Sequence, residues 1–137
     1  MIRVYKAARK LEVMSAGKVL HEFHIALGRS PLGHKNQEGD RKTPEGIYTL
    51  DYKKSDSAFH RAIHITYPNT ADVASAKARG VSPGGQVMIH GQKNGSGWLS
   101  FITQQFDWTN GCIALGNGDM DALWGLVHEG TKIEILP

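Results

Sequence analysis

The hydrophobic and polar positions of this chain of 137 residues follow mostly the period of a β-strand. Alternating or short apolar runs predict strands over residues 2–6, 11–15, 18–27, 47–52, 62–67, 86–90 and 131–136. Ala16-Gly17 marks a hairpin turn between the second and third of these runs. The third run carries apolar residues on both of its faces, which predicts a well-buried strand. The pattern as a whole indicates a mainly β protein.

Two further segments have the features of short helices. Pro68-Asn69-Thr70 ends a strand and can cap a helix that runs to about Arg79 and stops at Gly80. The second helix shows one apolar face, with the spacing i, i+3, i+4 and i+7, formed by Met120, Leu123, Trp124 and Val127. Asn117 is its predicted N-cap. We therefore expect a single domain over residues 1–137, a mixed sheet or β-sandwich with one or two short helices.

A long polar connection separates the third predicted strand from the fourth. It runs from Gly28 to Gly46 and holds several glycines and prolines. Connections of this length inside a compact domain are usually functional or mobile.

Composition excludes several classes of function. Hydrophobic residues make up 40% of the chain and charged residues 21%, an ordinary globular balance. The net charge is +3, but the basic residues are scattered and are not interleaved with aromatic residues, so no nucleic-acid partner is expected. No apolar run approaches the roughly 18 residues that span a bilayer, so no membrane partner is expected either. Strand-like alternation with charges begins at Met1, which predicts a cytoplasmic protein, or a periplasmic one if a signal peptide has been removed.

The single cysteine, Cys112, excludes an internal disulfide and a cysteine-based zinc site. It follows Thr109-Asn110-Gly111, where glycine lets the chain bend sharply and lets a substrate carbonyl approach the main chain. Backbone N–H groups at such a turn can form an oxyanion hole beside the thiol. The alternative is a buried thiol with a structural role.

A candidate base stands 22 positions before the cysteine, in Ile89-His90-Gly91. A thiol needs a nearby base to become a thiolate near neutral pH, and histidine is the usual partner. A histidine at the end of an apolar strand, followed by glycine, would be held rigidly and face an open space. The alternative is an ordinary surface histidine, since the chain has 7 histidines.

Taken together, these segments resemble the signature of the YkuD family, the L,D-transpeptidase catalytic domain. The segments that carry the resemblance are Ile-His-Gly at 89–91 and Thr-Asn-Gly-Cys-Ile-Ala-Leu at 109–115. Residues 39–48 resemble the family's GD-x-x-TPEG-x-Y segment, residues 59–69 the strand before the histidine, and residues 130–133 the closing GT-x-V strand. The resemblance covers nearly the whole chain in order.

The resemblance implies a mechanism as well as a fold. Cys112 would attack the carbonyl that joins an L-centre to a D-residue in a peptidoglycan stem peptide, giving a thioester. His90 would take the thiol proton and later activate the acceptor. Gly111, Asn110 and Gly91 would position the substrate or its oxyanion, with the Cys112 N–H. No cofactor is expected.

Two positions depart from the commonest family pattern. Many relatives have histidine where this chain has Asn110, and many have arginine where it has Ala114. These departures and the expected cytoplasmic setting favour hydrolysis over crosslinking. The reaction expected is an L,D-carboxypeptidase reaction that removes the terminal D-alanine from soluble murein tetrapeptides during recycling. The alternatives are a periplasmic L,D-transpeptidase, for crosslinking or for lipoprotein attachment or release, and a non-catalytic peptidoglycan-binding module.

Four further residues are candidates for contact with the substrate. His60 and His64 are four apart on a predicted strand and would share a face that could line the pocket. Arg61 would reach the substrate only if the strand bulges, and Tyr67 ends the same segment. Histidines four apart on a helix can bind zinc, but this segment is strand-like and lacks an HExxH pattern, so no metal is expected. Thr43-Pro44-Glu45 is interpreted as a turn that shapes the fold.

Overall fold

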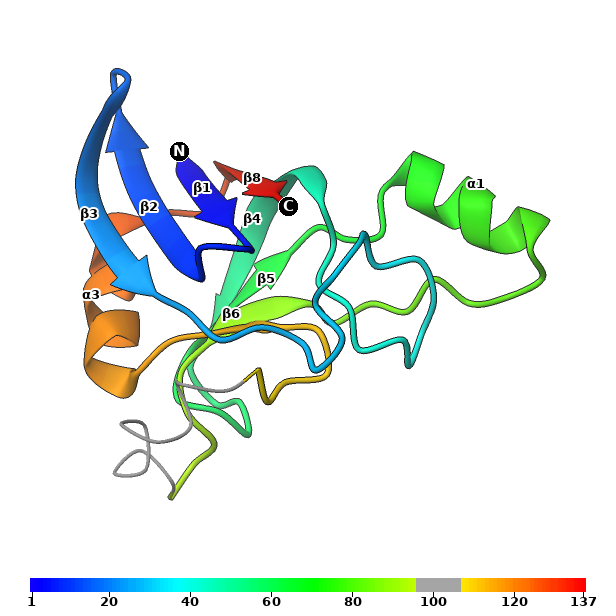
Figure 1. Ribbon diagram of the computed structural model, residues 1–137. Helices are drawn as coiled ribbons and strands as arrows, with labels where there is room; N and C mark the ends of the chain where they lie inside the picture. Colours follow the sequence, from blue (N-terminus) through cyan, green and yellow to red (C-terminus); the bar gives the residue numbers. More distant parts are fainter. Residues whose placement is uncertain (96–106) are drawn as a thin grey trace.

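A computed structural model describes residues 1–95 and 107–137, and its main feature is a curled sheet of 8 strands (Figure 1). In chain order the strands are β1 (Ile2–Tyr5), β2 (Lys10–Ser15), β3 (Lys18–His24), β4 (Gly46–Lys54), β5 (Ala62–Ile65), β6 (Met88–His90), β7 (Ile113–Ala114) and β8 (Thr131–Leu136). Their order in the sheet is β3-β2-β1-β8-β4-β5-β6-β7. The prediction of a mainly β fold is confirmed.

The sheet is mixed, and its centre is built from the two ends of the chain. β1 runs parallel to β8, with Ile2 opposite Ile133, and β6 runs parallel to β7. The other pairings are antiparallel. Alternate residues of β1 and β8 are buried, among them Val4 and Ile135, because successive side chains of a strand point to opposite faces.

The two edges of the sheet approach each other. After β3 the chain continues to Ala26, which forms a two-way bridge with Ala114 of β7, each N–H donating to the other's carbonyl at 2.9 Å. Gly28 then pairs with Thr109. This contact brings the long connection that follows β3 directly onto the segment that precedes β7.

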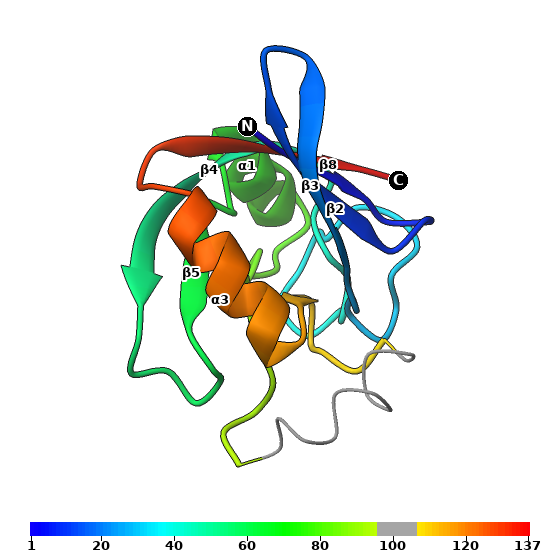
Figure 2. The same cartoon turned by 90° about the vertical axis from the view of Figure 1, so that its left-hand side faces the viewer.

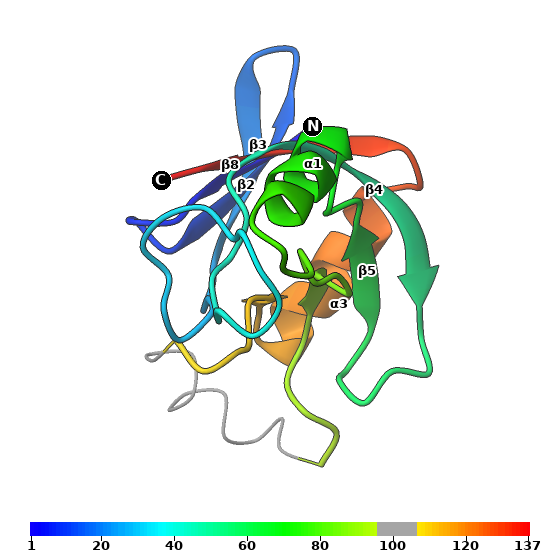
Figure 3. The ribbon, with the colours of Figure 1, turned by 90° about the vertical axis from the view of Figure 1, so that its right-hand side faces the viewer.

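The two helices of the described residues lie on different sides of the molecule. α3 (Asn117–Leu126) crosses the curled sheet and buries Met120 and Leu123 in the core (Figure 2). α1 (Thr70–Ala78) lies on the other side of the molecule, in front of the sheet when seen as in Figure 3. As predicted, Asn69 caps α1: its side chain accepts from the Asp72 N–H, while the Asp72 side chain accepts from the Asn69 N–H.

A buried ammonium holds the long connection in place. Lys6 is 2% exposed, and its Nζ donates to the carbonyls of Gly33 and Thr43, both at 2.8 Å, and to the Glu45 carboxylate at 3.1 Å. Burial lowers the pKa of Lys6, while Glu45 opposes that change. One side chain, directly after β1, therefore contacts both ends of the segment 33–45.

Two expectations about these elements are wrong. β3 is largely exposed, with Val19 at 48% and Leu20 at 56%, because it is an edge strand whose apolar residues find no second layer. Asn117 does not cap α3, because the cap is Gly116 and Asn117 is the first helical residue. The Asn117 side chain instead accepts a hydrogen bond from the Gln92 N–H at 2.9 Å. Neither described helix is long and apolar enough to span a membrane.

Candidate active site

Cys112 and His90 are brought together by the parallel pairing of β6 with β7. In that register Ile89 lies opposite Ile113 and His90 opposite Ala114. Cys112 is two residues before Ala114, so an extended chain turns its side chain to the same face as that of His90. Both residues line one cavity of about 340 Å³. The sequence distance of 22 residues is thus closed by two adjacent strands.

The His90 ring is held between aromatic side chains and its tautomer is determined. It stacks on Phe59 with ring centroids 4.0 Å apart and meets Trp108 edge-on at 5.7 Å. Its Nδ1 lies 2.6 Å from the Gly91 carbonyl oxygen. Because a carbonyl can only accept, Nδ1 carries the proton, and Nε2 of the neutral ring is left as an acceptor.

Burial changes the acid–base properties of this histidine. The residue is 2% exposed, and burial lowers its pKa to about 4, although the Gly91 carbonyl opposes the change. His90 is therefore neutral at pH 7 and can accept a proton. The expectation that it faces an open space is corrected, since the ring lies beneath Phe59 and Trp108 and only contributes to the wall of the cavity.

The Cys112 thiol is only partly exposed and makes two local contacts. Its Sγ accepts from the Met88 N–H at 3.4 Å and lies 3.5 Å from the Gln86 carbonyl, to which the thiol can donate. Burial raises the pKa of the thiol, while the Met88 N–H and the positive charge of Lys35 oppose that rise. These shifts favour a protonated thiol and a neutral imidazole in the resting protein.

The turn that carries the cysteine is braced by Thr109, a residue that the sequence analysis did not single out. Its hydroxyl accepts from the Gly111 N–H at 3.1 Å and donates to the Cys112 carbonyl at 2.7 Å. The Gly111 N–H is therefore occupied, which corrects its expected role as an oxyanion donor. Within the described residues the Cys112 N–H has no acceptor, so it is the backbone donor available to an oxyanion. A threonine two residues before a glycine is common in turns, so this pattern could have identified Thr109 from the sequence.

Gly111 is needed for space. Its φ is +131°, and a Cβ there would lie 2.7 Å from the Lys42 carbonyl oxygen. The Gly111 carbonyl accepts from the buried Thr43 hydroxyl at 2.9 Å. Residues 42–43 of the TPEG-like segment thus pack against the turn that carries Cys112, in agreement with the interpretation of that segment as one that shapes the fold.

Gly91 is also required for space, because its neighbours leave no room for a Cβ. A Cβ on Gly91 would lie 2.7 Å from the Asn117 Oδ1 and 2.8 Å from the His60 carbonyl oxygen. Its N–H donates to the same His60 carbonyl at 2.8 Å. These contacts hold the Gly91 carbonyl, and with it the His90 ring, in one orientation. Gly91 is therefore a positioning residue.

His60 and Arg61 do not lie in the cavity with Cys112 and His90. β5 begins at Ala62, and Arg61 has a φ of +47°, so neither residue belongs to the strand. The His60 Nε2 lies 2.6 Å from the Asp121 carboxylate, and the Arg61 guanidinium lies over the Trp124 ring at 5.0 Å. Both side chains are directed toward α3, and substrate contact by them stays an untested prediction.

His64 and Tyr67 also lie outside the cavity that Cys112 and His90 line. The His64 Nδ1 is 2.6 Å from the Asp51 carboxylate, and its ring stacks on Tyr52. Tyr67 is 2% exposed, and its hydroxyl donates to the Pro83 carbonyl at 2.7 Å. The expectation that His60 and His64 share a strand face is wrong, because β5 excludes His60.

The cavity has a mixed aromatic and cationic wall that sequence reasoning missed. Besides Cys112 and His90 it is lined by Arg29, Phe59, Lys93, Trp108, Thr109 and Asn110. Trp108 and Thr109 adjoin the cysteine motif, but Arg29 and Phe59 enter from distant segments. Over residues 1–95 and 107–137, no three His, Cys, Asp or Glu side chains are placed to hold a metal ion.

Comparison with known proteins agrees with the fold. Residues 1–135 match the YkuD family, the L,D-transpeptidase catalytic domain, and the chain belongs to that family. The L,D-transpeptidase-like protein YafK of Escherichia coli (strain K12) is 32% identical over 112 residues, which are 77% of this chain and 44% of YafK.

Solved structures show the same fold. The helical cell shape determining protein Pgp2 from Campylobacter jejuni superposes with a TM-score of 0.73 at 28% identity, over 98% of this chain and 46% of that chain. L,D-transpeptidase 1 of Mycobacterium tuberculosis superposes with a TM-score of 0.62 at 17% identity, over 100% of this chain and 61% of that chain, and shows the fold alone. The chain spans less than half the length of YafK and Pgp2.

Proposed function

We propose that this chain is a cysteine-dependent L,D-carboxypeptidase that removes the terminal D-alanine from soluble murein tetrapeptides. The observation that carries the proposal is the pairing of β6 with β7, which sets Cys112 and a neutral His90 in the wall of one cavity. Membership of a family of L,D-transpeptidase catalytic domains supports peptidoglycan peptides as the substrate class.

The reaction would proceed in two halves. His90 Nε2 takes the thiol proton as Cys112 Sγ attacks the amide carbonyl, and the Cys112 N–H donates to the oxyanion. The C–N bond then breaks, and the imidazolium returns the proton to the amine of the departing D-alanine. Water replaces the D-alanine, gives a proton to Nε2 and attacks the thioester. The C–S bond breaks, and the thiol recovers its proton.

The charge of the cavity supports hydrolysis rather than transfer to an amine. Among the described residues that line it are the basic side chains of Arg29 and Lys93, and none of those residues is an aspartate or a glutamate. They favour the carboxylate of the departing D-alanine and disfavour an approaching ammonium acceptor. Ala114, where many relatives have arginine, is fully buried in its bridge with Ala26 and reaches no substrate.

The test is to incubate the protein with a disaccharide tetrapeptide, with and without an added D-amino acid, and to measure the molecular masses of the products. We expect tripeptide and free D-alanine in both samples. Cys112→Ala should abolish turnover without loss of folded structure, because the covalent route is gone. Exchange of the added D-amino acid with little tripeptide would assign transpeptidation to the same nucleophile, and an active alanine variant would refute the thioester route. The cytoplasmic setting is part of the proposal and is tested by fractionation of native cells.

A further inference from the structure

A histidine and a carboxylate form a second pair near Cys112, outside the cavity that His90 lines. The His64 Nδ1 lies 2.6 Å from an oxygen of the Asp51 carboxylate. Because a carboxylate only accepts, Nδ1 carries the proton and Nε2 is left as an acceptor. Within the described residues, this Nε2 makes no hydrogen bond. The pair therefore has the arrangement in which an aspartate orients a histidine base.

The register of the sheet places His64 on the face that carries Cys112. His64 of β5 lies opposite Met88 of β6. Cys112 directly precedes β7 and lies next to Met88, whose N–H donates to the Cys112 Sγ at 3.4 Å. Residues opposite each other in adjacent strands share a face of the sheet. With strands about 4.8 Å apart, the Cα atoms of His64 and Cys112 are about 10 Å apart.

The contacts of the His64 ring turn Nε2 toward the cysteine. Asp51 and Tyr52 belong to β4, and β5 lies between β4 and β6 in the sheet. The Tyr52 ring stacks on His64 with centroids 4.5 Å apart. The two nitrogens lie on different sides of an imidazole, so a ring that directs Nδ1 to β4 directs Nε2 toward β6 and Cys112.

A hollow of about 390 Å³ joins this histidine to the surroundings of the thiol. Asp51, His64, Thr66 and Gln86 are among the residues that line it. The Gln86 carbonyl oxygen lies 3.5 Å from the Cys112 Sγ, so the hollow begins at His64 and ends beside the sulfur. Gln86 has a φ of +54°, which residues other than glycine rarely adopt and which gathers at functional sites.

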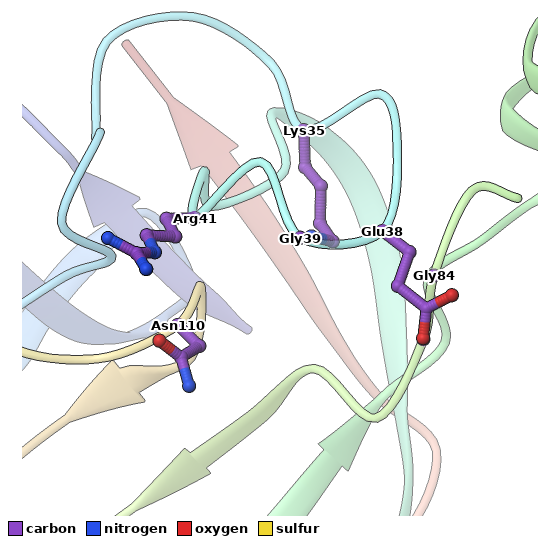
Figure 4. Close-up of a pocket in the computed structure, with 7 residues that line it drawn as sticks. Lys35, Glu38, Gly39, Arg41, Gly84 and Asn110 are labelled. Atoms are coloured by element: carbon purple, nitrogen blue, oxygen red, sulfur yellow. The ribbon is translucent and has the colours of Figure 1, made fainter. Parts of the chain in front are cut away.

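A separate hollow, also bordered by the turn that carries Cys112, offers no comparable base. Its volume is about 380 Å³, and its lining includes Lys35, Glu38, Arg41 and Asn110 (Figure 4). Glu38 is the one carboxylate among the described residues that line it, and it lies across the hollow from Asn110 (Figure 4). Asn110 is two residues from Cys112, so Glu38 stands away from the thiol.

His90 is better suited to the first half of the reaction than to the second. Burial lowers its pKa to about 4, so its imidazolium readily gives a proton to the departing amine. The same property makes the neutral ring a weak acceptor for a proton from water. The ring also lies beneath Phe59 and Trp108, which leaves little room beside it for a water.

We propose that His64, oriented by Asp51, is the base of the second half of the reaction, in place of His90. After D-alanine has left, a water in the hollow gives a proton to the His64 Nε2 as its oxygen attacks the thioester carbon. The C–S bond then breaks, and the proton passes from Nε2 to the Cys112 Sγ, which restores the thiol and the neutral ring. This role rests on the proposed function, which supplies the thioester. Formation of the thioester, and with it kcat/KM, still depends on His90.

The distances are compatible with this role. An attacking water lies about 3 Å from the carbon and about 3 Å from its base, so about 6 Å separates the base from the carbon. The thioester carbon is bonded to Sγ, and Nε2 is directed from β5 toward β6. The gap between the two groups is therefore shorter than the separation of about 10 Å between their Cα atoms.

The test separates formation of the thioester from its hydrolysis. p-Nitrophenyl acetate acetylates a reactive thiol, and after excess ester is removed the loss of the acetyl mass from the intact protein gives the hydrolysis rate. We expect His64→Gln to be acetylated as fast as the wild-type protein and to lose the acetyl group about 100-fold more slowly, the usual contribution of a general base. Asp51→Asn should slow only the same step, by about tenfold, because it acts through His64. His128→Gln, at an exposed position, is the matched control and should change neither step.

The tetrapeptide gives an independent measurement. His64→Gln should release about one D-alanine per protein molecule and keep the tripeptide as a thioester, whereas His90→Gln should be slow to release D-alanine at all. Unchanged hydrolysis of the acetyl group in His64→Gln, an equal loss in both steps, or no acylated protein with either reagent would overturn the role of His64. Slower loss of the acetyl group in His64→Gln, with a tetrapeptide that the wild-type protein leaves intact, would support that role and refute the carboxypeptidase proposal.

Discussion

The buried, neutral state of His90 predicts a specific dependence of stability on pH. The ordinary histidine pKa of 6.5 is lowered to about 4 in the folded protein. As the pH falls from about 6.5 to about 4, the unfolded chain takes up a proton on His90 that the folded protein does not. Stability therefore falls across this window, and the loss is complete below about pH 4.

The size of the effect follows from the two pKa values. A tenfold difference in proton affinity corresponds to about 1.4 kcal/mol. The difference between 6.5 and about 4 therefore corresponds to roughly 3 kcal/mol. That is a large share of the 5–15 kcal/mol that holds a typical domain folded.

Urea unfolding at a series of pH values measures this contribution. Carboxylates also titrate below pH 5, so the relevant quantity is the difference between the wild-type protein and His90→Gln, which cannot titrate at this position. The wild-type unfolding free energy should fall more steeply from pH 6.5 to pH 4, by roughly 3 kcal/mol. Replacing the surface residue His128 with glutamine should leave the steep dependence in place.

A parallel pH dependence in the wild-type protein and His90→Gln would refute the reasoning. It would mean that the folded protein admits a proton to His90 as readily as the unfolded chain does. The same lowered pKa predicts that turnover persists well below pH 6.5, because the base form is lost only as the pH falls through about 4. A loss of kcat/KM with an apparent pKa near 6.5 would contradict a buried base.

The remaining predictions concern the turn that carries Cys112. Gly111→Ala should cost at least about 2 kcal/mol in urea unfolding, because of its φ of +131° and a Cβ 2.7 Å from the Lys42 carbonyl oxygen. Its control, Gly125→Ala within α3, meets nothing within 4 Å and should stabilise the protein by up to about 1 kcal/mol. Thr109→Val removes the hydroxyl that joins the Gly111 N–H to the Cys112 carbonyl, so kcat should fall by about tenfold or more with KM less affected. Unchanged kcat in that variant would show that the turn keeps its shape without the hydroxyl.

Local pattern was enough to predict most of the elements. Alternating residues predicted the strands around Ile2 and Ile133, and the polar group at Asn69 predicted the start of α1. These features depend on neighbours in the sequence, so they can be recognised without the fold. The Thr-Asn-Gly-Cys segment and the Ile-His-Gly segment were also recognisable, because their residues match the signature of the family in order.

The tertiary structure decided what these elements do. Val19 and Leu20 are exposed because β3 is at the edge of the sheet, a place set by strand order and not by the residues of β3. His90 is buried because Phe59 and Trp108 close over it from segments 31 and 18 residues away.

Tertiary structure also decides which residues surround the turn that carries Cys112. Arg41 and Asn110 are 69 residues apart in the chain and line one hollow because the segment after β3 folds back onto the segment before β7. Periodicity and spacing report which residues share a strand face or a helical face. The pKa of a group and the partners of its charge depend on which distant segments pack around it, and that is determined only when the sheet curls and its edges meet.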